Sequence, residues 1–135
     1  MKDETQPPAA EPALRTLAMP GDANPNGDIF GGWVMAQMDL AGSVPASERA
    51  QGRVSTVAID AVRFHAPIYI GDLVSCYASI VRIGTTSIHA RVETWAKRRH
   101  DSTLVRVTEG TLVYVALDNN GRPRPVLESK KESGV

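Results

Sequence analysis

Disulfides, membrane spans and a secretory signal are all missing from this chain of 135 residues. Its one cysteine, Cys76, excludes an intramolecular disulfide and any metal site built from several cysteines. The longest apolar stretches, such as Leu112 to Leu117, are too short to span a bilayer, and the N-terminus lacks the apolar segment of a secretory signal. These absences predict a cytoplasmic protein.

An excess of charge of either sign is missing too, because 15 Lys and Arg balance 15 Asp and Glu. A neutral chain has no general attraction for nucleic-acid phosphates or anionic lipid. We therefore expect no nucleic-acid or membrane partner. A multiply charged anion would need a local cluster of positive side chains to bind here.

Several catalytic and metal-binding motifs are also absent. The sequence has neither the GxSxG of serine hydrolases nor the GxGxxG of dinucleotide-binding folds. Its three histidines show no HExxH or HxH spacing. The loop from Asp22 to Asp28 begins like a calcium loop, but Trp33 stands where the bidentate Glu is required. We therefore expect no metal and no redox cofactor.

The residues that are present predict one domain over 14–126, with disordered tails at 1–13 and 127–135. Apolar side chains surround most of a helix expected from Gly31 to Gly42, which Pro45 should kink or end. Runs rich in Val, Ile, Thr and Tyr predict a short strand and then four long ones, at Arg15–Met19, Val54–His65, Leu73–Ile83, Ser87–Lys97 and Leu104–Leu117. The predicted fold class is α+β, with one buried helix wrapped by an antiparallel sheet.

Asp39 is the most informative residue, because it is an ionisable side chain within an otherwise apolar helix. Such a group must be paired, protonated or functional. A carboxylate satisfied by structural partners and a catalytic carboxylate both fit this position. Cys76, by contrast, alternates within a strand between Val74 and Ala78 and is expected to be a small buried core residue.

A loop rich in Asn and Gly precedes the helix and offers a place for an oxyanion. Asn24 and Asn26 come shortly before Gly31 and Gly32, so their amide side chains lie near the free N–H groups of a helix N-terminus. These donors and the positive end of the helix dipole suit a carbonyl oxygen that develops negative charge.

Two further segments have side chains that suit phosphate. The turn formed by Gly84, Thr85, Thr86 and Ser87 offers hydroxyl and N–H groups, although an ordinary turn has the same composition. The run Lys97-Arg-Arg-His100 is the densest basic cluster, although such runs are usually solvated. Together the two segments could hold one polyphosphate ligand.

The stretch from Leu14 to Asp39, LRTLAMPGDANPNGDIFGGWVMAQMD, is similar nearly residue for residue to the signature of the acyl-CoA thioesterases of the YciA type. The similarity continues through GRVSTV at 52–57, GTTS at 84–87 and YVA at 114–116, and covers about residues 14–126. The chain therefore resembles a family of small hotdog-fold thioester hydrolases.

This resemblance implies a hotdog fold and hydrolysis of acyl-CoA thioesters to free CoA and a carboxylic acid. It implies dimers that assemble further, often as trimers of dimers, which are hexamers. Asp39 matches the family's catalytic carboxylate and Asn24 an amide position of related hydrolases. Gly32 marks the helix start whose N–H faces the thioester oxygen, with Gly31 beside it in the substrate site.

From these residues we expect Asp39 to act as a general base on water or to attack the thioester itself. The site is expected to be shared, with the Asn24 loop of one chain meeting Asp39 of another. We also expect Gly84 to Ser87 to hold the pyrophosphate of CoA, with Lys97 and Arg98 near its ribose phosphate.

Two other functions remain open at this point. One is a non-catalytic sensor that binds acyl-CoA without cleaving it. The other is a hydroxyacyl dehydratase, which would need a His paired with an acid at the site, and no His precedes His65 in the chain.

Overall fold

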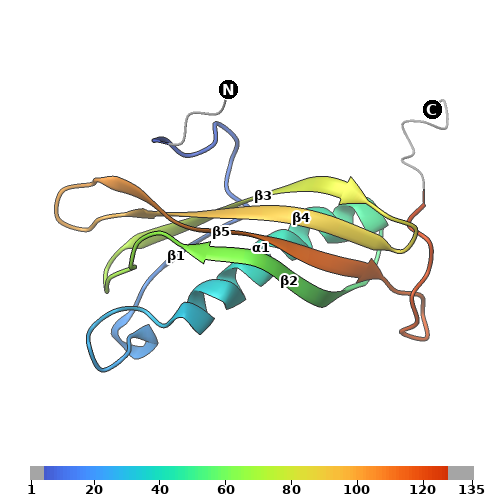
Figure 1. Cartoon of the computed structure of the whole chain (residues 1–135), viewed down its shortest axis with the longest axis horizontal. Coiled ribbons are helices and arrows are strands. Elements are labelled where there is room, and N and C mark those ends of the chain that lie inside the picture. The colour runs from blue at the N-terminus through green and yellow to red at the C-terminus, as the bar shows by residue number, and fades with distance from the viewer. Residues whose placement is uncertain (1–4, 128–135) are drawn as a thin grey trace.

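A computed structural model describes residues 5–127 and contains one antiparallel sheet and one long helix. The strands are β1 (Leu14–Leu17), β2 (Val54–Phe64), β3 (Leu73–Ile83), β4 (Ser87–Lys97) and β5 (Leu104–Ala116). Their order across the sheet is β1-β3-β4-β5-β2, so β1 and β2 form its two edges. The helix α1 (Gly31–Ala50) lies along one face of this sheet, as Figure 1 shows. The predicted α+β class is confirmed.

The long strands follow from their composition and from the short turns between them. All neighbouring strands are antiparallel, and the predicted strand boundaries agree with the structure to within two residues. A single 3-10 turn (Pro20–Asp22) interrupts the loop before the helix. The turn and loop residues thus fall where Gly, Pro, Asn and Asp are concentrated.

The helix differs from its prediction in two ways. It continues through Pro45 to Ala50, so the expected extent from Gly31 to Gly42 is too short, and the helix does not end at Pro45. Proline costs roughly 3 kcal/mol within a helix, but Ala46 and Ala50 on the following turns are buried against the sheet, and their packing holds those turns in place. The sheet also covers only one side of the helix within one chain. On the uncovered side, Leu40 is 58% exposed and Val44 is 44% exposed.

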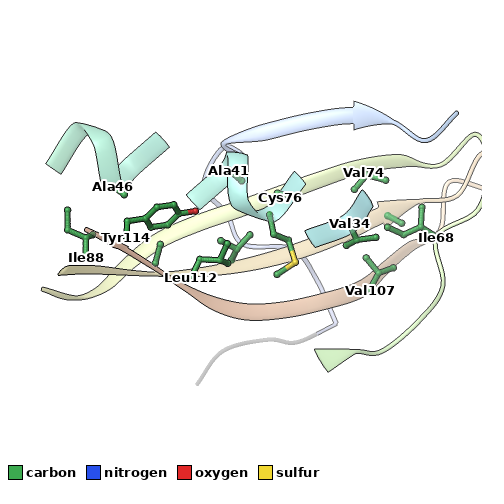
Figure 2. Packing of buried hydrophobic residues seen from close by; sticks show 14 of the residues in the cluster. Val34, Ala41, Ala46, Ile68, Val74, Cys76, Ile88, Val107, Leu112 and Tyr114 are labelled. Carbon is green, nitrogen blue, oxygen red and sulfur yellow. The ribbon is translucent and has the colours of Figure 1, made fainter. Parts of the chain in front are cut away.

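The core lies between α1 and the inner face of the sheet. Figure 2 shows Tyr114 reaching from β5 towards the helix between Ala41 and Ala46, with Cys76 beside Ala41. Cys76 is fully buried, which confirms its predicted role in the core. Burial also raises the pKa of its thiol to about 11, so it remains protonated at neutral pH.

Parts of both predicted tails lie within the described residues and contact the folded domain. Residues 1–4 of the predicted N-terminal tail, and 128–135 of the C-terminal one, lie outside the described residues. Ala13 extends the ladder of β1, because its N–H donates to the carbonyl of Cys76. Arg49 near the end of the helix donates to the carbonyl of Leu127.

Candidate active site

Asp39 is held by two side chains from neighbouring strands. Its Oδ1 accepts a hydrogen bond of 2.6 Å from the hydroxyl of Thr56 on β2, and its backbone carbonyl accepts one of 2.7 Å from the hydroxyl of Tyr114 on β5. Thr56 and Tyr114 are direct partners in the β2–β5 register, so the sheet itself sets their spacing. The carboxylate therefore has a defined orientation at the surface between α1 and β2.

The ionisation of Tyr114 follows from this arrangement. Burial and the negative charge of Asp39 both raise the pKa of its phenol above the ordinary value. Tyr114 thus remains a neutral hydrogen-bond donor at physiological pH. It supports the helix at Asp39 and does not serve as a base.

Thr56 is a site residue that the sequence analysis did not identify. Its position within GRVSTV, a segment that carries the family resemblance, was the available signal. Threonine in a strand is usually explained by β propensity alone. Only the packing of α1 over β2 shows that its hydroxyl meets the carboxylate 17 positions earlier in the chain.

Asn24 shapes the loop in front of the helix. Its Oδ1 accepts hydrogen bonds from the backbone N–H groups of Asn26 and Asp28, at 2.9 and 3.1 Å. Because the oxygen closes this turn, the Nδ2 group is the part of the side chain left to donate to a ligand. The loop thus holds Asn24 in a fixed position.

The helix begins next to this loop with exposed donors. Phe30 precedes the helix and contributes no side-chain cap, while its carbonyl accepts from Trp33 and Val34. Within residues 5–127, the N–H groups of Gly31 and Gly32 have no hydrogen-bond partner in the protein. Both glycines are exposed, so these donors are open to a ligand.

Asn24 and Gly31 open onto a common cleft of about 380 Å³. Asp39 does not line this cleft, although the helix carries both parts of the predicted site. Seven residues, or about 10 Å of helical rise, separate Gly32 from Asp39. One chain therefore presents the amide donors and the carboxylate as two separate half-sites.

The two segments predicted to hold phosphate do not meet within one chain. Gly84 to Ser87 form the turn between β3 and β4, while Lys97 ends β4 ten residues after Ser87, about 33 Å away. Figure 1 shows the β3–β4 turn and the β4–β5 loop at opposite ends of the sheet. The expectation that both hold one ligand is therefore wrong for a single chain.

Arg98 also differs from its expected role. Its guanidinium forms an ion pair with the buried carboxylate of Asp72, donates to the carbonyl of Pro67 and lies 4.6 Å from the centre of the Tyr69 ring. These contacts hold the β2–β3 connection against the end of β4. Lys97, by contrast, lines a groove on the sheet that contains polar side chains such as Arg15 and Ser75 and apolar ones such as Leu73 and Trp95.

Neither a metal-binding cluster nor a membrane-spanning helix is present among the described residues. Over residues 5–127, no three His, Cys, Asp or Glu side chains gather where a metal ion could bind. The one long helix of that segment is not apolar enough to cross a membrane.

Known proteins resemble this chain closely in sequence and structure. A family model, described as Thioesterase superfamily, matches residues 26–103. The acyl-CoA thioester hydrolase YciA of Salmonella typhimurium is 48% identical over 122 residues, which cover 88% of this chain and 92% of that protein.

Two solved structures have similar folds. A hexameric thioesterase from Yersinia pestis has a TM-score of 0.85 and 48% identity, covering 90% of this chain and 99% of its own. A hexameric broad-specificity acyl-coenzyme A thioesterase, solved as a mutant with one aspartate changed to alanine, has a TM-score of 0.84 and 45% identity over 88% of each chain.

Proposed function

The chain belongs to the thioesterase superfamily, as an acyl-CoA thioester hydrolase of the YciA type, and we propose that Asp39 is the group with which it activates water. The observation that carries this assignment is the hydrogen bond from Thr56 to Asp39 Oδ1. This bond fixes one carboxylate oxygen and leaves the other, Oδ2, to accept a proton.

The reaction needs only acyl-CoA and water, with no metal or redox cofactor. Asp39 takes a proton from water as the water oxygen attacks the thioester carbon. The N–H of Gly32 donates to the oxyanion, and Asn24 Nδ2 orients the water or the thioester. The C–S bond then breaks, and the CoA thiolate receives the proton that Asp39 carried.

The competing role for Asp39 is direct attack on the thioester, which forms an anhydride with the enzyme. The two mechanisms differ in the origin of one oxygen atom. In a single turnover in ¹⁸O-labelled water, general-base catalysis puts the label into the acid product. A nucleophilic Asp39 acquires the label itself and first releases unlabelled acid when water attacks the aspartyl carbonyl of the anhydride.

A second copy of the chain brings the two half-sites together in this proposal. Leu40 and Val44 on α1, and Val57 on edge strand β2, are large exposed apolar side chains beside the Asp39–Thr56 pair. Burial of this surface in a dimer would favour association and exclude water from the carboxylate. Dimers of this kind, three to a hexamer, are consistent with the hexameric relatives.

The nucleotide end of CoA then lies between subunits. Gly84 to Ser87 contact the pyrophosphate from one chain, and Lys97 approaches the ribose phosphate from another. Arg98 supports the neighbouring loop through Asp72. A cytoplasmic location remains a prediction from the sequence.

The proposed activity is tested by incubating the protein with an acyl-CoA panel and measuring free CoA with a thiol reagent. Asp39→Asn should lower kcat by roughly 100-fold or more, because the amide keeps the shape but accepts no proton. Binding of acyl-CoA without CoA release would support the sensor. Conversion of a 3-hydroxyacyl-CoA in the panel to enoyl-CoA and water, without CoA release, would support the dehydratase.

A further inference from the structure

Three polar side chains form a row across the inner face of the sheet. Cys76 on β3 pairs with Thr94 on β4, Thr94 pairs with Thr108 on β5, and Thr108 pairs with Phe64 on β2. Cys76, Thr94 and Thr108 are each 0% exposed. A buried hydroxyl without a hydrogen bond is costly, so each member of this row needs a partner.

Cys76 and Thr94 contact each other, whereas Thr108 has no hydrogen-bond partner among the described residues. The Oγ1 of Thr94 lies 3.4 Å from the Sγ of Cys76, within hydrogen-bonding distance for sulfur. The Oγ1 of Thr108 has no partner among the described residues. The polar row thus ends in one unused hydroxyl, on the side nearest to Phe64.

Thr108 forms part of the wall of the cleft that contains Asn24 and Gly31. The rest of the wall is largely apolar, with Val34, Ile68 and Phe64 among its side chains. Figure 2 shows Val34 and Ile68 together at one end of the core, next to β5. The cleft therefore runs from the donors at the helix start to a buried hydroxyl.

The other polar side chains of the cleft have different surroundings. Asn24 Oδ1 is held by its own loop, and His65 Nε2 lies 2.7 Å from Glu109 Oε2. Asp28 is only partly buried, so water can solvate it. Thr108 is the fully buried polar residue of the cleft.

We propose that the Thr108 hydroxyl binds an oxygen atom on the acyl chain of the substrate, so that the enzyme favours acyl-CoAs with a hydroxyl or keto group in a short chain. This inference rests on the proposed function, because it requires the acyl group to enter the cleft beside Gly31. A threonine hydroxyl both donates and accepts, so it suits either kind of oxygen. A purely apolar chain would leave the hydroxyl unpaired, and the site would discriminate against it.

The test compares matched substrates with the oxygen at two depths. Butyryl-CoA is paired with 3-hydroxybutyryl-CoA, and hexanoyl-CoA with its 3-hydroxy and 5-hydroxy derivatives, with free CoA as the readout. In at least one pair, the ratio of kcat/KM for the hydroxylated over the plain substrate should fall about tenfold in Thr108→Val. Thr108→Ser keeps the hydroxyl and should retain the ratio.

Thr111→Val is the matched control, because it makes the same change on the same strand. Thr111 is only partly buried and pairs with Arg91, and three positions along a strand place it on the other face from Thr108. Its ratios should equal those of the wild type. If Thr108→Val does not melt cooperatively, Thr108→Ala replaces it in the same comparison.

The inference is overturned if folded Thr108→Val, or Thr108→Ala in its place, keeps the wild-type ratio in every pair. That result would leave the thioesterase proposal intact, since the wild type would still release CoA. Absence of CoA release from every substrate by the wild type would instead contradict the proposed function.

Discussion

A carboxylate on a mostly apolar helix needs partners, and Asp39 finds them at both its side chain and its backbone. Thr56 donates to its Oδ1 and Tyr114 to its carbonyl oxygen. The first contact orients the carboxylate, whereas the second fixes the segment of helix that carries it. If Asp39 is the general base, as proposed, Thr56 is a positioning residue that acts through it.

At the residue scale, Thr56→Val should lower kcat about tenfold with little change in KM, because it releases the carboxylate without touching the CoA-binding segments. Thr56→Ser restores a hydroxyl and should recover most of the rate. Ser55→Ala, one position earlier on the same strand, is the control and should have wild-type kinetics. An equal loss in Thr56→Val and Thr56→Ser would contradict the orienting role of the hydroxyl.

At the scale of elements, Gly42 is a point of close contact between α1 and the sheet. A Cβ atom at this position would lie 2.5 Å from the hydroxyl oxygen of Tyr114 and 3.1 Å from its Cε1. Glycine here allows Tyr114 to reach the carbonyl of Asp39, one turn before it in the helix. The close approach of helix and strand is thus linked to the site.

Gly42→Ala should therefore destabilise the fold by about 1–3 kcal/mol, measured by urea unfolding, because the added methyl group overlaps a buried ring. Tyr114→Phe removes the hydroxyl that makes the shortest contact. When Tyr114→Phe is added to Gly42→Ala, it should lower the free energy of unfolding by less than it does in the wild type, or even raise it. Fully additive effects of the two changes would show that they do not collide.

A network of charges at Glu109 joins β4, β5 and the residue that follows β2. Its Oε2 lies 2.7 Å from His65 Nε2, and Arg91 and Arg106 also form ion pairs with its carboxylate. The hydrogen bond from Arg91, with support from His65 and Arg106, lowers the pKa of Glu109 to about 2. The folded protein therefore favours the ionised carboxylate.

This shift predicts how stability depends on pH. Because the pKa of Glu109 lies below its ordinary value of 4.5, its contribution to stability is present above pH 4.5 and is lost as the pH falls towards 2. Glu109→Gln should lower the free energy of unfolding by about 1 kcal/mol at neutral pH and by less at pH 3, measured by urea unfolding. An equal difference at both pH values would rule out this titration as the cause.

At the scale of the whole molecule, catalysis is expected to need more than one chain. The cleft at the helix start contains Asn24 and Gly31. The carboxylate of Asp39 lies outside this cleft, about 10 Å further along the helix. The exposed apolar side chains beside Asp39 offer a surface for a second copy. The complete site would then combine Asn24 and Gly32 of one chain with Asp39 of its partner.

Mixing two inactive variants tests this arrangement. Asn24→Ala and Asp39→Ala should each lose most of their activity. When they are refolded together, half of the dimers are hybrid and half of the sites in each hybrid are intact, so activity should approach about a quarter of wild type. Subunit exchange is confirmed by mass spectrometry. A mixture that exchanges but is no more active than its parents would show that the two residues act within one chain.

The sequence by itself determined the class of the fold and most strand boundaries, and it identified Asp39 as a candidate site residue. Alternation and turn residues are local signals, and a lone carboxylate on an apolar helix is visible without coordinates. The burial of Cys76 followed from the same local pattern. The residues alone also indicated Asn24 and the N–H groups at Gly31 and Gly32, and the family resemblance added the roles expected of Asn24 and Gly32.

Only the tertiary structure decided which distant residues meet. It placed Thr56 at Asp39, Arg98 at Asp72, and the unused hydroxyl of Thr108 in the cleft with Asn24. It also showed that α1 continues past Pro45, because the packing of buried Ala46 and Ala50 outweighs the tendency of proline to end a helix. Each of these outcomes depends on which faces of helix and sheet are packed together, and residues far apart in the chain decide that jointly.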